Sequence, residues 1–223
     1  MSDRWATFDC YGTLIDWDGG IRDTLEQLWP ELDSDELLAR YHEIEPRVQL
    51  QPGLPYRDVL AESLRLLAEH EGLGLDPRDR TALADSLPRW RAFPEVPSSL
   101  DELRARGWRL AILSNTDPDL LEASLAQIGA PVDTTVTAAE AGSYKPAHGH
   151  WTTFFDQHDA ERTRCVHVAA SAFHDLAPCA ELAVPAVWIN RLAEESDLPR
   201  AADLSDLTGL ADVLDRLVPA TVS

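Results

Sequence analysis

The sequence predicts an α/β protein, built on a doubly wound parallel sheet with a helical segment inserted near the N-terminus. Apolar runs of four to six residues without alternation recur along the chain, as in strands that are buried on both faces. From about residue 94 onward these runs alternate with segments of helical period. Residues 17–92 show helical spacing and no strand-like alternation, which indicates an insert. A chain of 223 residues is long enough for one core and such an insert.

The first predicted strand is the apolar run of residues 4–9, which ends at Asp9. Gly12 and Thr13 then turn the chain, and backbone amides in such a turn can hold an anion. The helical insert follows, and four residues are expected to divide it into separate helices: Pro46, Pro52, Gly53 and Pro55.

Strands and helices alternate in the rest of the chain. A helix at residues 98–106 is expected to end at Gly107, and one at residues 117–128 near Gly129, because glycine commonly follows the last turn of a helix. The predicted strands of this part are residues 109–114, 134–137, 165–169 and 186–190. Further helices are predicted at residues 150–158, 173–182 and 207–217.

Composition excludes several classes of protein. There are 39 acidic and 19 basic residues, giving a net charge of -20, which argues against nucleic acids and anionic membranes as partners. The chain has no apolar run of 18 residues and no signal-like N-terminus, so we expect a cytoplasmic protein without a membrane span. Its three cysteines are widely spaced, which favours a reducing compartment over a disulfide framework or a zinc site.

Lysine is almost absent from the sequence. Of the 19 basic residues, Lys145 is the only lysine and the others are arginine. Because arginine can do most of the work of a surface cation, a single lysine indicates a position that requires a compact ammonium group. Chance retention on a surface loop is the alternative.

Polar residues follow the predicted strands where ligands bind in such sheets, beyond their carboxyl ends. Together they offer a nucleophile, a cationic partner, polar positioning groups and an acid–base group. Each residue alone could cap a turn or a helix, but their convergence favours a catalytic site. The residues are Asp9, Ser114 with Asn115, Lys145, and Ser171 with Asp175.

The sequence resembles the haloacid dehalogenase superfamily over nearly its whole length, and within it the L-2-haloacid dehalogenase branch. This resemblance implies a Rossmann-like core at residues 1–16 and 93–223, with a helical cap domain at residues 17–92. Four motifs carry it, in order: Phe8-Asp9-Cys10-Tyr11-Gly12-Thr13-Leu14, Leu113-Ser114-Asn115, Tyr144-Lys145-Pro146 and Ser171-Ala172-Phe173-His174-Asp175.

The resemblance implies a hydrolase that needs no cofactor and converts a short (S)-2-haloacid to the (R)-2-hydroxyacid and halide. Asp9 would attack C2 of the acid, expel halide and become an ester. Water activated by Asp175, with Lys145 nearby, would then cleave the ester. Thr13 and Lys145 would orient Asp9. Positive partners are needed because an anion attacks an anion.

The resemblance also implies contacts to this small anionic substrate. Ser114 would help to hold its carboxylate, while Asn115 and Arg40 of the helical insert would cradle the leaving halide. A solvated helix arginine is the alternative for Arg40. The predicted substrate-binding set is completed by Tyr11, Trp151 and Ser171.

Two positions distinguish the sequence from the magnesium phosphatases of the same superfamily. In those enzymes the first motif resembles Asp-x-Asp, and an acidic residue lies four positions before the last aspartate. In this sequence Tyr11 occupies the position of the second aspartate of Asp-x-Asp, and Ser171 occupies the position of the other acidic residue. Because a hard cation prefers several oxygen ligands, no metal site is predicted.

The sequence also departs from the dehalogenase pattern. Ala170-Ser171-Ala172 stands where Ser-Ser-Asn is usual, Trp151 where a tyrosine is usual, and His174 is not the usual residue beside the last aspartate. Three alternatives stay open: a related hydrolase that opens another C–X bond, for example in a strained cyclic amino acid, a magnesium phosphatase, and a non-enzymatic binding protein. Relatives often form homodimers, although the sequence contains no interface signature.

Overall fold

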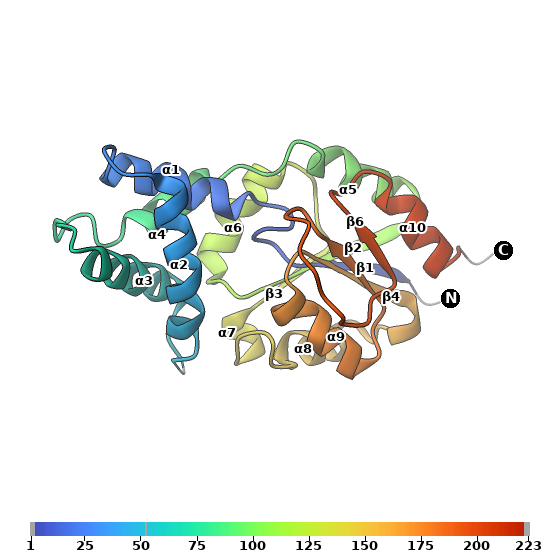
Figure 1. The fold of residues 1–223 in the computed structure, drawn as a ribbon. Helices are drawn as coiled ribbons and strands as arrows, with labels where there is room; N and C mark the ends of the chain where they lie inside the picture. Colours follow the sequence, from blue (N-terminus) through green and yellow to red (C-terminus); the bar gives the residue numbers. More distant parts are fainter. Residues whose placement is uncertain (1–2, 52, 221–223) are drawn as a thin grey trace.

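The computed structural model describes residues 3–51 and 53–220. Its centre is a sheet of six parallel strands in the order β3-β2-β1-β4-β5-β6, with helices on both faces (Figure 1). This is the predicted doubly wound α/β fold. The strands are β1 (Arg4–Phe8), β2 (Trp108–Ser114), β3 (Thr134–Thr137), β4 (Cys165–Ala169), β5 (Ala186–Ile189) and β6 (Ala202–Leu204).

The strand order places β1 at the centre of the sheet, between β2 and β4. All five residues of β1 are buried, because both faces of this strand are covered. The chain reverses its direction of winding at β1, and ligands bind beyond the carboxyl ends of the strands at such a switch point. The end of β1 is therefore where this topology positions a site.

Helices cover the two faces of the sheet. α5 (Val96–Ala105), α6 (Pro118–Ile128) and α10 (Leu210–Leu217) pack with one large hydrophobic cluster. α8 (Gly149–His158) and α9 (Ala177–Leu182) belong to a second cluster on the opposite face, which contains Trp5, Trp151 and Trp188. A short helix, α7 (Ala138–Ala141), precedes α8.

The first four of the α-helices between β1 and β2 form a cap at one side of the sheet (Figure 1). Two antiparallel segments connect this cap to the core: Asp16 N donates to Arg91 O at 2.8 Å, and Phe93 N donates to Leu14 O at 3.0 Å. These paired segments support the proposed domain boundary between residues 16 and 17 and between residues 92 and 93. The cap helices are α1 (Trp17–Leu28), α2 (Ser34–Gln49), α3 (Tyr56–Glu71) and α4 (Ala82–Ser86).

The base of the cap requires a glycine. A Cβ atom on Gly20 of α1 would lie 2.3 Å from the Trp90 ring, closer than side-chain atoms can approach. Trp90 in turn donates its indole N–H to Ser86 Oγ at 2.9 Å, which holds the ring in the hydrophobic cluster. The two ends of the insert therefore pack directly on each other.

The structure corrects three of the element predictions. Pro46 lies inside α2 and does not end it: the helix continues to Gln49 although the proline removes one backbone hydrogen bond. The helix predicted at residues 173–182 consists of a π-helical turn, η3 (Ala172–Leu176), followed by α9. β6 adds a sixth strand, which the sequence does not predict because its three residues form no apolar run.

None of the helices in the described part of the chain is both long and apolar enough to span a membrane.

Candidate active site

Asp9 lies directly after β1, where the switch point places a ligand. Its backbone N–H donates to Val168 O at 3.1 Å, which continues the pairing with β4 for one residue. Gly12 then adopts a φ of +84°, a conformation that favours glycine and lets the chain turn back toward the carboxylate. Thr13 completes the turn: its hydroxyl donates to Asp9 Oδ2 at 3.1 Å and accepts from Ala170 N at 2.9 Å.

Lys145 reaches the site from the loop after α7. Its side chain is 1% exposed, and its ammonium donates to Asp9 Oδ1 at 2.7 Å, to Asp175 Oδ1 at 2.7 Å and to Leu113 O at 2.9 Å. The three donor hydrogens of a lysine ammonium match these three acceptors. The single lysine of the sequence therefore bridges the two carboxylates.

Asp175 is fully buried in η3, the π-helical turn after β4. Its Oδ1 atom accepts hydrogen bonds from Lys145 Nζ and from His167 Nε2, the latter at 2.9 Å. Its Oδ2 atom has no hydrogen-bond partner among the described residues. One oxygen of this carboxylate is therefore bound by two donors, and the other is buried without a hydrogen bond to the described residues.

The charges of the three groups depend on one another. Burial raises the pKa of Asp9; Lys145 opposes this shift, Asp175 adds to it, and the pKa stays above its usual value. Burial would raise the pKa of Asp175 too, but Lys145 and His167 hold it well below its usual range. Burial disfavours the charged form of Lys145, yet the two carboxylates raise its pKa above the ordinary value. At neutral pH the site therefore contains a charged ammonium and an ionised Asp175.

Ser114 is the last residue of β2 and Asn115 follows it, and their side chains have different roles. Asn115 Oδ1 accepts from Lys145 N at 2.6 Å, and Asn115 Nδ2 donates to Lys145 O at 3.1 Å, so the amide clamps the backbone of the lysine. Ser114 also lines the cavity, and its buried Oγ has no partner among the described residues. The Ser114 hydroxyl therefore makes no hydrogen bond to these residues, whereas Asn115 already positions Lys145.

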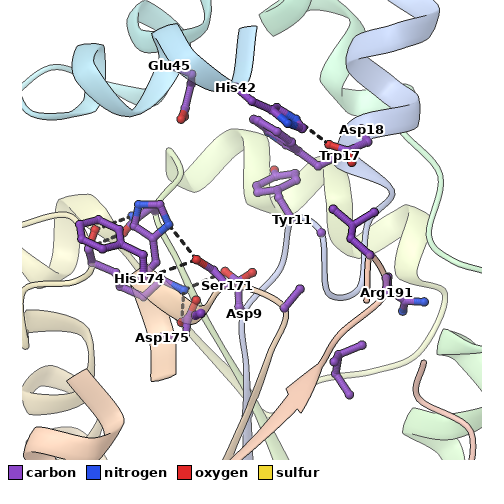
Figure 2. Close-up of a pocket in the computed structure, with 18 of the residues that line it drawn as sticks. Asp9, Tyr11, Trp17, Asp18, His42, Glu45, Ser171, His174, Asp175 and Arg191 are labelled. Atoms are coloured by element: carbon purple, nitrogen blue, oxygen red, sulfur yellow. Dashed lines mark hydrogen bonds and ion pairs between the residues drawn. The ribbon is translucent and has the colours of Figure 1, made fainter. Parts of the chain in front are cut away.

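These residues line a cavity of about 700 Å³ between the core and the cap. Figure 2 shows Asp9, Ser171 and Asp175 at its core side, with Glu45 of α2 pointing toward them from the cap and His42 of α2 beside Trp17 and Asp18. A cavity of this volume between two structural units has the size of a small-molecule site.

Tyr11 and Ser171 also line the cavity, and both side chains are already engaged. The Tyr11 hydroxyl forms a hydrogen bond of 2.9 Å with Ser124 Oγ, and burial raises the pKa of its phenol far above the usual value. Ser171 Oγ caps the π-helical turn by accepting from His174 N at 3.1 Å, and it also bonds His174 Nδ1 at 3.1 Å. Neither residue supplies an acidic group beside Asp9.

The predicted contact of Arg40 with the substrate is not found. Its guanidinium donates to Glu43 at 2.5 Å and to Glu71 at 3.3 Å at the surface of the cap, and it does not line the cavity. The reason is the orientation of α2, because Arg40 is not among the residues that this helix buries: Leu37, Leu38, Tyr41, Glu45 and Val48.

Trp151 does not reach the cavity either. Its ring is completely buried in the second hydrophobic cluster, at 5.3 Å from the His167 ring. The side chain points into the core because α8 packs this face against β2 and β3. Trp151 therefore lies in the core beneath the site and is not among the residues that line the cavity.

The sequence prediction missed two residues at the site. His167 contacts Asp175 from the middle of β4. The sequence feature that could have identified it is a polar residue within the otherwise apolar run Cys165–Ala169. Glu45 is 4% exposed and lines the cavity, and burial raises its pKa to about 7. The sequence feature that could have identified Glu45 is its helical spacing from Leu38 and Tyr41, which places a carboxylate on the side that the helix buries.

The donor set does not suit a magnesium ion. No group of three or more His, Cys, Asp or Glu side chains is placed to hold a metal within residues 3–51 and 53–220. The ammonium of Lys145 lies 2.7 Å from both Asp9 and Asp175 and repels a divalent cation from them. Ser171 provides a hydroxyl where a phosphatase has an acidic residue.

Comparisons with known proteins agree with this geometry. Residues 4–180 match the haloacid dehalogenase-like hydrolase family. The chain is 30% identical over 194 residues to the (S)-2-haloacid dehalogenase of Pseudomonas sp. (strain YL), covering 84% of this chain and 83% of that enzyme. A solved L-2-haloacid dehalogenase is 26% identical, has a TM-score of 0.80, and the match covers 95% of this chain and 99% of the other.

A phosphatase is also among the relatives. The chain is 29% identical over 157 residues to the ribulose-1,5-bisphosphate 5-phosphatase of Halopiger xanaduensis, covering 66% of this chain and 64% of that enzyme. The dehalogenase of strain YL matches a larger share of both chains. The chain thus belongs to the haloacid dehalogenase superfamily of hydrolases, in its L-2-haloacid dehalogenase branch.

Proposed function

We propose that this protein hydrolyses a short (S)-2-haloacid to the (R)-2-hydroxyacid and halide, through an ester on Asp9. One observation carries the proposal: Lys145 bridges Asp9 and Asp175 in a cavity where Tyr11 and Ser171 replace the acidic groups of a phosphatase. This arrangement supplies a nucleophile, a charge partner and a second carboxylate, and no further acid.

In the first step Asp9 attacks C2 of the acid from the side opposite the halogen, and the carbon–halogen bond breaks as the C–O bond forms. Backside attack inverts the centre, so an (S)-acid gives the (R)-product. Two hydrogen bonds support this role, from Lys145 to Oδ1 and from Thr13 to Oδ2, since they fix the orientation of the carboxylate. The ammonium also offsets the repulsion between the two anions.

In the second step a water molecule attacks the carbonyl carbon of the Asp9 ester. Asp175 takes a proton from that water, the ester C–O bond breaks, and the proton passes to the oxygen of the departing hydroxyacid. The other proton stays on the regenerated Asp9 carboxyl and leaves to solvent. The free Oδ2 atom of Asp175 supports this role, because the other oxygen is already bound by two donors.

Binding of the substrate carboxylate is proposed for Ser114. Ser114 lines the cavity, its hydroxyl is buried without a partner among the described residues, and an unpaired buried hydroxyl is costly unless a ligand pairs with it. Trp151 and Arg40 are not part of this proposal, because neither side chain lines the cavity.

A second candidate is the hydrolysis of another carbon–heteroatom bond by the same Asp9 chemistry. It is favoured by the cap side of the cavity, where Glu45 faces inward and Arg40 does not. Arg22 does line the cavity, but it is paired with Asp35 at 2.7 Å. A halide ion gains little from such a surface, and a volume of about 700 Å³ admits substrates larger than a three-carbon acid.

The two candidates and a phosphatase predict different results with the purified protein. We expect halide release from (S)-2-chloropropionate, poor reaction of the (R)-enantiomer, and full activity after treatment with EDTA, because no step uses a divalent cation. A strained cyclic amino acid and p-nitrophenyl phosphate with magnesium are assayed in parallel. Activity that EDTA abolishes and magnesium restores would establish the phosphatase alternative, and ring opening without halide release the second candidate.

A further inference from the structure

A histidine lies beneath the active site, in the middle of a buried strand. His167 of β4 is 0% exposed, and its ring lies 5.3 Å from the Trp151 ring. Its Nε2 atom is 2.9 Å from Asp175 Oδ1, and its Nδ1 atom is 2.8 Å from Thr7 Oγ1. β1 and β4 are paired so that Thr7 and His167 are register partners. Thr7 of β1 lies two residues before Asp9. The histidine thus connects the strand of the nucleophile with the second carboxylate.

The contact with Asp175 fixes the role of one ring nitrogen. Lys145 and His167 hold the pKa of Asp175 well below its usual range, so its carboxylate is ionised and only accepts hydrogen bonds. His167 Nε2 must therefore carry a hydrogen and donate it. Nδ1 lies 2.8 Å from Thr7 Oγ1, so the threonine hydroxyl holds the other side of the ring. Both ring nitrogens and the threonine hydroxyl are satisfied, as buried polar groups usually are.

The position of the donor decides which oxygen of Asp175 is free. Lys145 and His167 both donate to Oδ1, whereas Oδ2 has no partner among the described residues. A carboxylate held by two donors at one oxygen cannot rotate about its Cβ–Cγ bond without breaking both bonds. Lys145 alone would not impose this, since the same ammonium is shared with Asp9.

We propose that His167, fixed by Thr7, is the positioning residue that keeps Asp175 Oδ2 directed to the water that cleaves the Asp9 ester. This inference rests on the proposed function for the identity of the second step. It predicts that His167 affects hydrolysis of the ester much more than its formation, because Asp9 is oriented separately by Lys145 and Thr13. A histidine that only filled the core would affect both steps together through the stability of the protein.

The first test needs no substrate. Nitrogen-15 NMR of the intact protein labelled at histidine should show His167 with a protonated Nε2. The carbon-13 signal of the Asp175 carboxyl should change in His167→Phe, which lacks the donor. It should stay near the wild-type position in His167→Gln, whose amide N–H can take the place of Nε2–H. An unprotonated Nε2, or an Asp175 carboxyl signal that does not change when the donor is lost, would overturn the inference.

The second test measures the two steps separately. Wild type and variants are mixed with (S)-2-chloropropionate and quenched, and the ester is counted by intact-protein mass spectrometry. We expect His167→Phe to form ester within about threefold of the wild-type rate but to hydrolyse it at least ~30-fold more slowly, so that ester accumulates. This is part of the ~10²–10⁴-fold effect of a positioned acid–base group. His167→Gln should recover most of the hydrolysis rate.

His158→Gln is the matched control, because His158 is a half-buried histidine of α8 that bonds Thr134 Oγ1 at 3.2 Å and lies outside the cavity lining. It should not accumulate ester. Equal slowing of both steps in His167→Phe, with no recovery in His167→Gln, would show a purely structural role. If wild type forms no ester at all, the proposed function fails, while the NMR test still decides the hydrogen bonding of His167 and Asp175.

Discussion

Replacing Asp9 by asparagine is expected to reduce turnover of (S)-2-chloropropionate by at least ~10⁴-fold, the scale of removing a catalytic nucleophile. The amide has nearly the same shape as the carboxylate but does not attack a saturated carbon, so neither halide release nor the ester should be detected. The measurement is halide release over hours, combined with intact mass. Lys145 keeps Asp175 as its counter-ion, and the midpoint of thermal unfolding should change little.

Asp156→Asn is the control for this substitution, since it makes the same chemical change on the exposed surface of α8. It should retain wild-type turnover. A slow regain of activity in Asp9→Asn with a mass increase of about one dalton would be deamidation back to aspartate, which also identifies the residue. Turnover above about one per cent of wild type without that mass change would mean that Asp9 is not the nucleophile.

The second large effect is expected for Lys145→Arg, with a loss of at least ~100-fold in turnover. The substitution keeps the charge, but a planar guanidinium cannot direct hydrogen bonds to Asp9, Asp175 and Leu113 O from one point. The site is also closed around the ammonium, whose side chain is 1% exposed. The bulkier group should therefore cost about 1–3 kcal/mol of unfolding free energy by overpacking, which a shift in the denaturant midpoint would detect.

The expected loss of stability in Lys145→Arg follows from the structure and not from the sequence. In the sequence, the position of Lys145 after the third strand suggests the rim of a pocket, where a change of cation would not affect folding. Burial of Lys145 makes it part of the core. Arg78→Lys is a suitable control, because it is the reverse exchange at a side chain that is 89% exposed, and it should change neither property. Near wild-type turnover of Lys145→Arg would show that positive charge alone is required.

Most of the fold and the centre of the site follow from the sequence for one physical reason. In a parallel sheet the strands are buried on both faces, so they read as apolar runs, and a polar residue at the end of a run lies at the common edge. Asp9, Ser114 and Asp175 are identified in this way, and the scarcity of lysine identifies Lys145. β6 is not predicted because it is a short edge strand without buried residues.

The direction in which side chains point is harder to predict. Motif similarity assigns Arg40 to the substrate, but which face of α2 meets the core depends on packing against α1 and α3. The apolar stripe through Leu38 and Tyr41 contains Glu45 and excludes Arg40, so this signal was present in the sequence. Trp151 and His167 are comparable cases, because the helix and strand that carry them bury both side chains against each other.

The ester on Asp9 is the central claim, and a single turnover in oxygen-18 water tests it most directly. Excess protein is mixed with substrate in labelled water, and the product and the digested protein are analysed by mass spectrometry. If Asp9 is the nucleophile, the hydroxyacid of the first turnover carries ordinary oxygen from the carboxylate, and the label appears in the peptide that contains Asp9. Label in the hydroxyacid of that first turnover, with an unlabelled Asp9, would show that water attacks the substrate directly and would contradict the account.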